Sequence, residues 1–187
     1  MTKIIIIPGS TRTGSHNVRL AVAIKQALEA TDADITLVDL SDYPMPIYNG
    51  DLEQASGAPR EARDLAALIA LHQGVVLVNP EYNASITPLM KNTLDWLSRD
   101  MGDVKPYQNR AFALASCSPG ALGGIRALNH MRDTLISIGA QEVISPQIGV
   151  GNAANAFDEN GNLAVERSKN MLQTYCDRLI EAANRYA

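Results

Sequence analysis

The sequence predicts an α/β protein built around a doubly wound, five-stranded parallel sheet. Short β-branched apolar runs alternate five times with longer amphipathic stretches, which is typical of strand–helix–strand units joined by right-handed crossovers. The central runs are apolar on both faces, as strands are when helices cover both sides of a parallel sheet. No repeat, low-complexity segment or Pro/Gly linker divides the 187 residues, so we expect a single domain over 1–187.

The elements follow in chain order. Strands are expected at 3–7 (KIIII), 35–39 (ITLVD), 74–79 (GVVLVN), 110–116 (RAFALAS) and 142–145 (EVIS), and helices near 16–30, 58–72, 87–100, 121–138 and 163–185. Ser15 is expected to cap the first helix, and Thr87 with Pro88 to start the third. Ligands of such sheets bind beyond the carboxyl ends of the strands, where the winding reverses. The loops after the first, third and fourth strands are therefore the candidate site.

Composition excludes several other functions. Hydrophobic residues make up 46% and charged residues 19%, the net charge is −4, and the basic residues are scattered, which argues against a nucleic-acid-binding surface. No apolar run approaches the roughly 20 residues that span a bilayer, and the apolar part of MTKIIIIPGS is too short for a signal peptide. Two cysteines form neither a disulfide framework nor a metal-ligand spacing, so we expect a cytoplasmic protein.

No metal site is expected either. The stretch FDENGN (157–162) begins like a calcium loop, but Leu163 stands where glycine is needed and Lys169 where a bidentate glutamate is needed. A turn before the last helix is the better interpretation.

The first loop, PGSTRTGSHN (8–17), has the groups that bind a phosphate. Gly9 and Gly14 allow the backbone to approach a ligand closely, and the following helix directs its free amides and positive dipole end into the loop. Arg12 adds a positive charge, and hydroxyls come from Ser10, Thr11, Thr13 and Ser15. A turn that merely caps the helix is the alternative, but a cap needs neither an arginine nor so many hydroxyls.

The residues that this loop lacks exclude two of the possible phosphate ligands. Its spacing begins like G-x-x-x-x-G-K-[ST], but the lysine is absent, and His16 and Asn17 follow Ser15. A triphosphate with magnesium needs that lysine, whereas a monophosphate does not. The dinucleotide fingerprint G-x-G-x-x-G is also absent, which argues against a pyrophosphate.

The other two loops suit a flat heterocycle. In NPEYNASITPLMKNTLDW (79–96), Glu81, Tyr82 and Asn83 follow the third strand and can offer a stacking surface with donors and acceptors. A structural tyrosine and a solvated glutamate are the alternative interpretations. The third loop, SCSPGALGGI (116–125), is a second glycine-rich loop whose backbone can come close to a ligand. Cys117 is expected to be a packing residue, because no histidine–carboxylate pair is visible to activate it.

With these three loops in order, the chain resembles the NADPH-dependent FMN reductase family, flavodoxin-like flavoproteins that include chromate- and quinone-reducing enzymes. The matches are GSTRTGSHN with G-S-x-R-x-x-S-x-N, PEYNASITPLMKNTLDW with P-E-Y-N-x-S-x-P-x-x-L-K-N-x-x-D-W, and SPGALGG with S-x-G-x-x-G-G. The resemblance covers nearly the whole chain; Met90, where the family commonly has leucine, is a mild departure. It implies the flavodoxin-like strand order 2-1-3-4-5.

The resemblance also implies noncovalently bound FMN. The FMN phosphate would be bound by Ser10, Arg12, Ser15 and Asn17; its ring would be lined by Pro80, Glu81, Tyr82 and Asn83 and approached by Ser116 and Ser118. NADPH or NADH would donate hydride to the flavin, and a quinone, free flavin, azo dye or metal oxyanion such as chromate would take up the electrons. No catalytic side chain is expected for the first half-reaction, because the cofactor carries the chemistry.

Two alternatives and one assembly question remain open at this point. A flavodoxin-type carrier to protein partners is disfavoured by the modest net charge of −4, and a non-catalytic nucleotide-binding regulatory module is the third possibility. Residues 86, 89, 90, 94 and 97 form an apolar stripe on the third helix, with Trp96 at its edge. Packing against the sheet explains this stripe; the resemblance instead favours a homodimer or homotetramer in which this helix, with Trp96 and Leu97, meets its mate.

Overall fold

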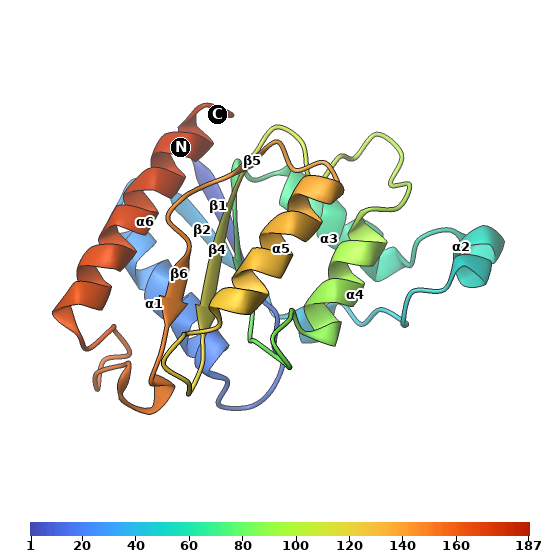
Figure 1. Ribbon diagram of the computed structural model, residues 1–187. Coiled ribbons are helices and arrows are strands. Elements are labelled where there is room, and N and C mark those ends of the chain that lie inside the picture. Colours follow the sequence, from blue (N-terminus) through green and yellow to red (C-terminus); the bar gives the residue numbers. More distant parts are fainter.

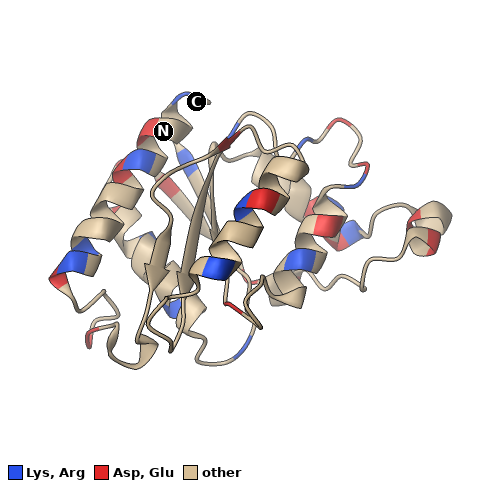
Figure 2. Ribbon diagram, viewed as in Figure 1, with Lys and Arg blue, Asp and Glu red and all other residues tan.

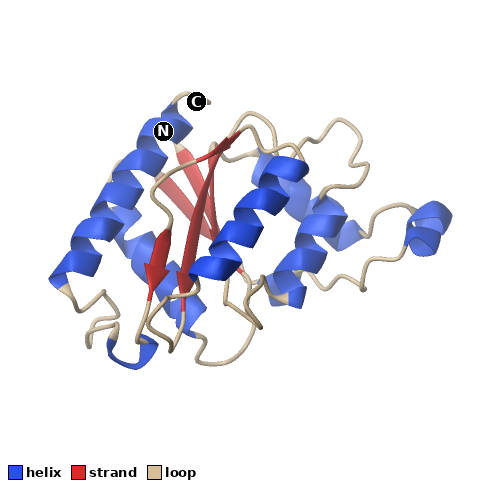
Figure 3. Ribbon diagram, in the orientation of Figure 1, coloured by secondary structure: helices blue, strands red, loops and turns tan.

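The computed structural model describes residues 1–187 and contains a parallel sheet between two layers of helices (Figures 1 and 3). The strands are β1 (Lys3–Pro8), β2 (Asp34–Leu37), β3 (Gly74–Val78), β4 (Ala111–Cys117), β5 (Glu142–Val143) and β6 (Ile148–Val150). Their order is β2-β1-β3-β4-β5, with β6 paired to β4. The predicted class and strand order are confirmed.

The fifth strand is divided, which the sequence did not predict. Glu142 and Val143 pair with the first residues of β4, while β6 pairs with its last three, Ala115–Cys117. Pro146 lies between the two short strands and has no amide hydrogen to donate to a ladder. A sixth strand therefore replaces the single run expected at 142–145.

All five expected helices are present, and one more appears. They are α1 (His16–Glu29), α3 (Arg60–Ala70), α4 (Pro88–Leu97), α5 (Ile125–Ser137) and α6 (Glu166–Asn184), with α2 (Gly50–Ser56) unexpected. Helix α5 begins four residues later than expected, because Gly123 and Gly124 have φ values of 62° and 83°, outside the range of a right-handed helix.

The sheet is buried on both faces. Helices α1 and α6 cover one face, and α3, α4 and α5 cover the other (Figure 1). The first strand shows why its isoleucine run was informative: Ile4 and Ile6 belong to the core under α1 and α6, while Ile5 and Ile7 belong to the core under the other three helices. Alternate side chains of a strand point to opposite faces, so both faces need apolar residues.

An arm between β2 and α3 stands out from the body and carries α2 at its tip (Figure 1). The arm is anchored on α4 because the Trp96 indole and the Asn92 amide both donate to the Pro46 carbonyl oxygen, at 2.7 and 2.9 Å. Trp96 and Leu97 are 0% and 2% exposed, so they pack within the chain and are not available to contact a second copy.

Basic and acidic residues are interspersed along the helices (Figure 2). None of the helices is both long enough and apolar enough to cross a membrane.

Candidate functional site

The three loops singled out in the sequence meet at one edge of the sheet. Strands β1, β3 and β4 are parallel neighbours, so their carboxyl ends, and the loops that follow them, lie side by side at the lower edge in Figure 1. We call these segments loop 1 (residues 9–15), loop 2 (79–87) and loop 3 (118–124).

Loop 1 is a concave set of hydrogen-bond donors at the start of α1. Ser15 caps this helix as predicted: its hydroxyl oxygen accepts from the amides of Asn17 and Val18, at 3.3 and 3.5 Å. No protein acceptor receives a hydrogen bond from the amides of Thr11, Thr13, Gly14 and His16. Free amides at a helix start, with the positive end of the helix dipole, bind anions.

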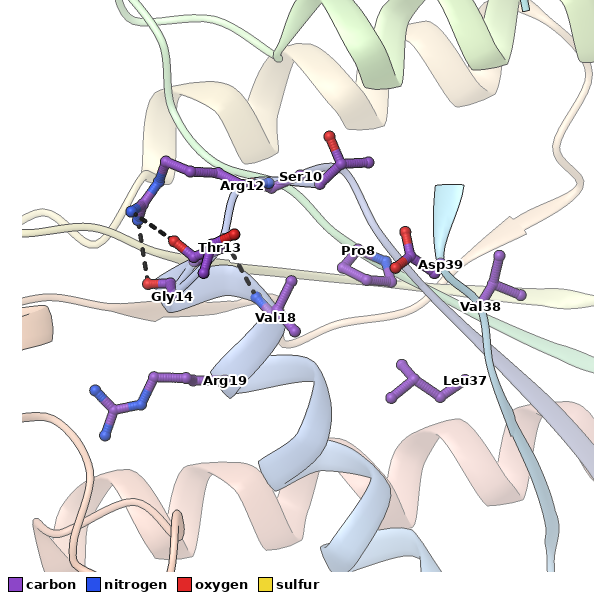
Figure 4. A pocket seen from close by; sticks show the side chains of 12 residues that line it. Pro8, Ser10, Arg12, Thr13, Gly14, Val18, Arg19, Leu37, Val38 and Asp39 are labelled. Carbon is purple, nitrogen blue, oxygen red and sulfur yellow. Dashed lines mark hydrogen bonds between the residues drawn. The ribbon is translucent and has the colours of Figure 1, made fainter. Parts of the chain in front are cut away.

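Two guanidinium groups flank loop 1. Arg12 is exposed and folds back over the loop, donating to the carbonyl oxygens of Thr13 and Gly14 at 3.1 and 3.2 Å (Figure 4). Arg19, on α1, also lines the cavity beside the loop and lies 4.5 Å from the centre of the Phe157 ring. Sequence reasoning missed Arg19; its place one turn after Ser15 was the available signal.

The cavity beside loop 1 has a volume of about 460 Å³ and extends toward the end of β2. Asp39 lies at that end (Figure 4), and its pKa is held below its usual value, chiefly by a hydrogen bond from the Ser41 amide. The free amides and Arg12 therefore lie on the loop 1 side of the cavity, and a carboxylate lies on the β2 side.

Buried polar contacts fix loop 1 against loop 2. The Thr87 hydroxyl lies 3.0 Å from both the Gly9 carbonyl oxygen and Asn79 Oδ1, and Thr87 also caps α4, as predicted, by accepting from the Met90 amide at 3.2 Å. A Cβ at position 9 would lie 2.7 Å from Asn79 Oδ1. Gly9 is thus required by the approach of loop 2. Asn79 was not singled out in the sequence, although a polar residue ending an apolar strand was a usable signal.

Asn17, in the first turn of α1, joins this helix to the end of β4. Its amide nitrogen donates to the Cys117 carbonyl oxygen at 2.8 Å, and its oxygen accepts from the Cys117 amide at 2.9 Å. Both polar atoms of this expected phosphate ligand are therefore engaged by β4. Burial raises the pKa of the Cys117 thiol to about 12, which keeps it protonated, in line with the packing role expected for it.

Loop 2 contains a tight turn that presents an aromatic side chain. Tyr82 and Ser85 exchange two backbone hydrogen bonds at 3.0 Å, and the residues between them, Asn83 and Ala84, have φ values of 49° and 63°. Tyr82 is 50% exposed, while Pro80 is buried. A half-exposed aromatic ring on a rigid turn is free to stack against a flat ligand.

Glu81 does not extend into solvent. Its side chain is 10% exposed and contacts the Arg126 guanidinium at 2.8 Å. The same carboxylate accepts from the backbone amides of Arg126 and Ala127, at 3.1 and 3.3 Å. The sequence left a solvated loop charge open as an interpretation, and the structure excludes it.

The two serines expected near the ring, Ser116 at the end of β4 and Ser118 in loop 3, are placed differently. Ser116 is fully buried and its hydroxyl has no partner; a Cβ at position 124 would lie 2.0 Å from that oxygen, so Gly124 covers Ser116 and has to be glycine. Ser118 is partly exposed and donates to the Gly120 carbonyl oxygen at 3.2 Å. Ser118 is the serine that is open to a ligand at the surface.

The residues present fit a flavin mononucleotide. The free amides and the arginine of loop 1 suit a single phosphate ester, and no lysine or acidic cluster is present there for a metal-bound triphosphate. Tyr82 is half-exposed and Ser118 partly exposed, so the two neighbouring loops each offer a side chain that can contact a ring.

The chain is similar in sequence to several known proteins. The family described as NADPH-dependent FMN reductase matches residues 2–155. An NAD(P)H-dependent FMN reductase of Pseudomonas aeruginosa is 31% identical over 173 residues, 91% of this chain and 89% of that protein. A 2-hydroxy-1,4-benzoquinone reductase of a Burkholderia species is 32% identical over 176 residues, 94% and 93% of the two chains.

A solved structure is similar over its whole length. The flavoenzyme NAD(P)H:(acceptor) oxidoreductase FerB of Paracoccus denitrificans superposes with a TM-score of 0.84 at 26% identity, covering 100% of this chain and 99% of that chain. A quinone reductase of Escherichia coli is 32% identical over 156 residues, 83% of this chain and 81% of that protein.

Proposed function

This chain belongs to the NADPH-dependent FMN reductase family, and from that premise we propose that its three-loop edge holds FMN and passes electrons from a nicotinamide nucleotide to a quinone. It is an oxidoreductase that uses FMN as cofactor and NAD(P)H as electron donor. The observation that carries the assignment to this edge is the set of free amides in loop 1, beside an arginine and at the start of α1.

Each loop has a part in this proposal. The amides of loop 1 bind the phosphate with the hydroxyls of Ser10 and Ser15, and Arg12 supplies the charge. Pro80, Tyr82 and Asn83 of loop 2 line one side of the ring, and Ser118 of loop 3 lines another. Asn17 and Ser116 do not contact the flavin in this proposal. Asn17 instead hydrogen-bonds the backbone of Cys117, and Ser116 packs against Gly124, so both stabilise the loops that do.

The chain's contribution to the chemistry is binding and orientation. Bound FMN supplies hydride acceptance and electron transfer. Tyr82 of loop 2 and Leu122 of loop 3 are 50% and 62% exposed, so these two loops offer the apolar surface on which a nicotinamide and then a quinone would be held in turn. The free amides around the site provide fixed dipoles that favour negative charge.

Quinones are the proposed acceptors because relatives that match over most of their length are named for them. Free flavins, azo compounds and chromate are further proposed acceptors.

We also propose that 1–187 acts as one FMN-binding domain in the cytoplasm, as a homodimer or homotetramer. A carrier that serves only protein partners is the second candidate, and the modest net charge of −4 disfavours it.

Steady-state oxidation of NADPH and NADH with benzoquinone, without any partner protein, tests the proposal. We expect turnover that depends on added FMN, with ping-pong kinetics because donor and acceptor use one face in turn. A protein that binds FMN but oxidises neither nucleotide would favour the carrier, and a protein that binds no FMN would overturn the assignment of the site.

A further inference from the structure

One largely buried carboxylate joins loop 2 to the helix that follows loop 3, and loops 2 and 3 form the proposed ring site. Glu81 of loop 2 accepts from the amides of Arg126 and Ala127 in the first turn of α5, the helix that follows loop 3. The Arg126 side chain adds contacts from Nε at 2.9 Å and from the second guanidinium nitrogen at 2.8 Å. These four contacts all end on a side chain that is 10% exposed.

Helix α5 has no cap of its own. The residue at its N-cap position, Gly124, has no side chain, and no side-chain cap is present. A cap with an oxygen is also excluded at position 124, where a Cβ would lie 2.0 Å from the Ser116 hydroxyl oxygen. The amides at the start of α5 therefore depend on a residue outside the helix, and Glu81 is that residue.

A second side-chain contact also joins loop 2 to α5. The Ser85 hydroxyl oxygen of loop 2 lies 3.1 Å from His130 Nδ1, one turn further along α5. Loop 2 thus contacts the first two turns of α5 at two positions, in addition to being held by the strand that precedes it.

We propose that Glu81 is a positioning residue of the flavin site: by capping α5 from loop 2 it holds the two ring-binding loops at a fixed spacing and keeps the site ready for the flavin. This rests on the proposed function. The carboxylate is suited to this role because one of its oxygens accepts from both helix amides while the other contacts the guanidinium. Binding to a preformed site avoids the cost of ordering the loops at the moment of binding.

The test measures FMN dissociation constants by fluorescence titration for the wild type, Glu81→Ala and Glu81→Gln, with the melting temperature of each apoprotein. We expect Glu81→Ala to raise the dissociation constant about tenfold or more, because the amides of Arg126 and Ala127 then lose their acceptor and no longer hold loop 2 against α5. Glu81→Gln has the same length and keeps an acceptor oxygen for the helix amides, so we expect it to stay within about threefold of the wild type. Glu181→Ala removes an exposed ion pair with Arg178 on α6 and serves as the matched control, with unchanged affinity.

The outcomes separate the two proposals. If the wild type binds no FMN, the proposed function fails. If the wild type binds FMN and a folded Glu81→Ala binds it equally well, with only a lower melting temperature, Glu81 is merely structural and the inference is overturned. Equal losses in Glu81→Ala and Glu81→Gln also overturn it, since the charge itself rather than the cap would then matter.

Discussion

Arg12 has the largest single-residue effect that we expect on cofactor binding. Its guanidinium holds the loop 1 backbone through the carbonyl oxygens of Thr13 and Gly14 and is the charge closest in sequence to the free amides. A guanidinium–phosphate contact is charge-assisted, so Arg12→Ala should weaken FMN binding by about 1–3 kcal/mol. Fluorescence titration measures this, and Arg60→Ala, which removes an exposed ion pair with Asp64, is the control; unchanged affinity in Arg12→Ala would contradict the assignment.

His72 gives the protein a pH dependence that is independent of the cofactor. It is 5% exposed, and burial is the main cause that lowers its pKa. Nδ1 lies 2.8 Å from the Leu68 carbonyl oxygen, which can only accept, so Nδ1 carries the proton and Nε2 accepts from the Thr36 hydroxyl at 2.9 Å. The neutral ring is therefore the form that the fold prefers.

The sign of the effect follows from this preference. The unfolded chain, with a histidine pKa near 6.5, binds the proton more readily than the folded chain, so stability falls as the pH drops below about 6.5 and is fully present above it. Urea unfolding at pH 7.5 and 5.5 checks this. We expect His72→Gln to reduce the difference between the two pH values, and a difference as large as in the wild type would show that other groups cause it.

At the scale of elements, the turn in loop 2 stores backbone strain. Ala84 has a φ of 63°, a conformation that costs about 1–2 kcal/mol for a residue with a Cβ. Ala84→Gly removes this strain. Glycine also raises the conformational entropy of the unfolded chain, which lowers the free energy of unfolding by about 0.4–1 kcal/mol. We therefore expect the free energy of unfolding to rise by a net amount of about 0.5–1 kcal/mol.

Urea unfolding compares this variant with Ala67→Gly, an exposed position inside α3. There the same substitution should lower the free energy of unfolding by about 0.8–1 kcal/mol. Destabilisation by both substitutions would mean that the turn is not strained. If Ala84→Gly also lowers FMN affinity, the stored strain serves to hold Tyr82 in position.

Because the arm is anchored on α4, substitutions at Trp96 and Leu97 are not a suitable test of oligomer formation. Charged residues at positions 96 and 97 would disrupt the core, because Trp96 and Leu97 are buried under the arm and against the sheet. A drop in oligomeric mass in such variants would therefore report misfolding. Exposed residues of the arm, such as Ile47 at 77% exposure, are the better positions for that experiment.

At the scale of the whole molecule, cofactor binding should stabilise the fold. A ligand that binds only the folded state at 100 times its dissociation constant adds about 2.7 kcal/mol, which corresponds to a rise in melting temperature of about 5–10 °C for a chain of this size. Riboflavin has the same ring without the phosphate and should produce a much smaller rise. Equal shifts with FMN and riboflavin in a thermal melt would show that loop 1 does not bind the phosphate.

Much of the architecture follows from local patterns. The isoleucine run of β1 demands helices on both sides, and the N-caps Ser15 and Thr87 lie where short polar residues precede amphipathic stretches. The division of the fifth strand and the addition of α2 were not predictable in the same way. A two-residue strand carries too little periodicity to recognise, and α2 buries no residues, so it has no apolar stripe.

The sequence by itself determined the fold class and the cofactor, and it predicted the three loops as the site, because strand periodicity, helix caps and phosphate-binding groups are encoded in neighbouring residues. Only the tertiary structure decided how individual side chains are used. Asn17 binds Cys117, 100 residues away, and Glu81 binds the start of α5, 45 residues away. Such partners meet only after the sheet has ordered its strands, and a hydrogen bond between them leaves no pattern along the chain.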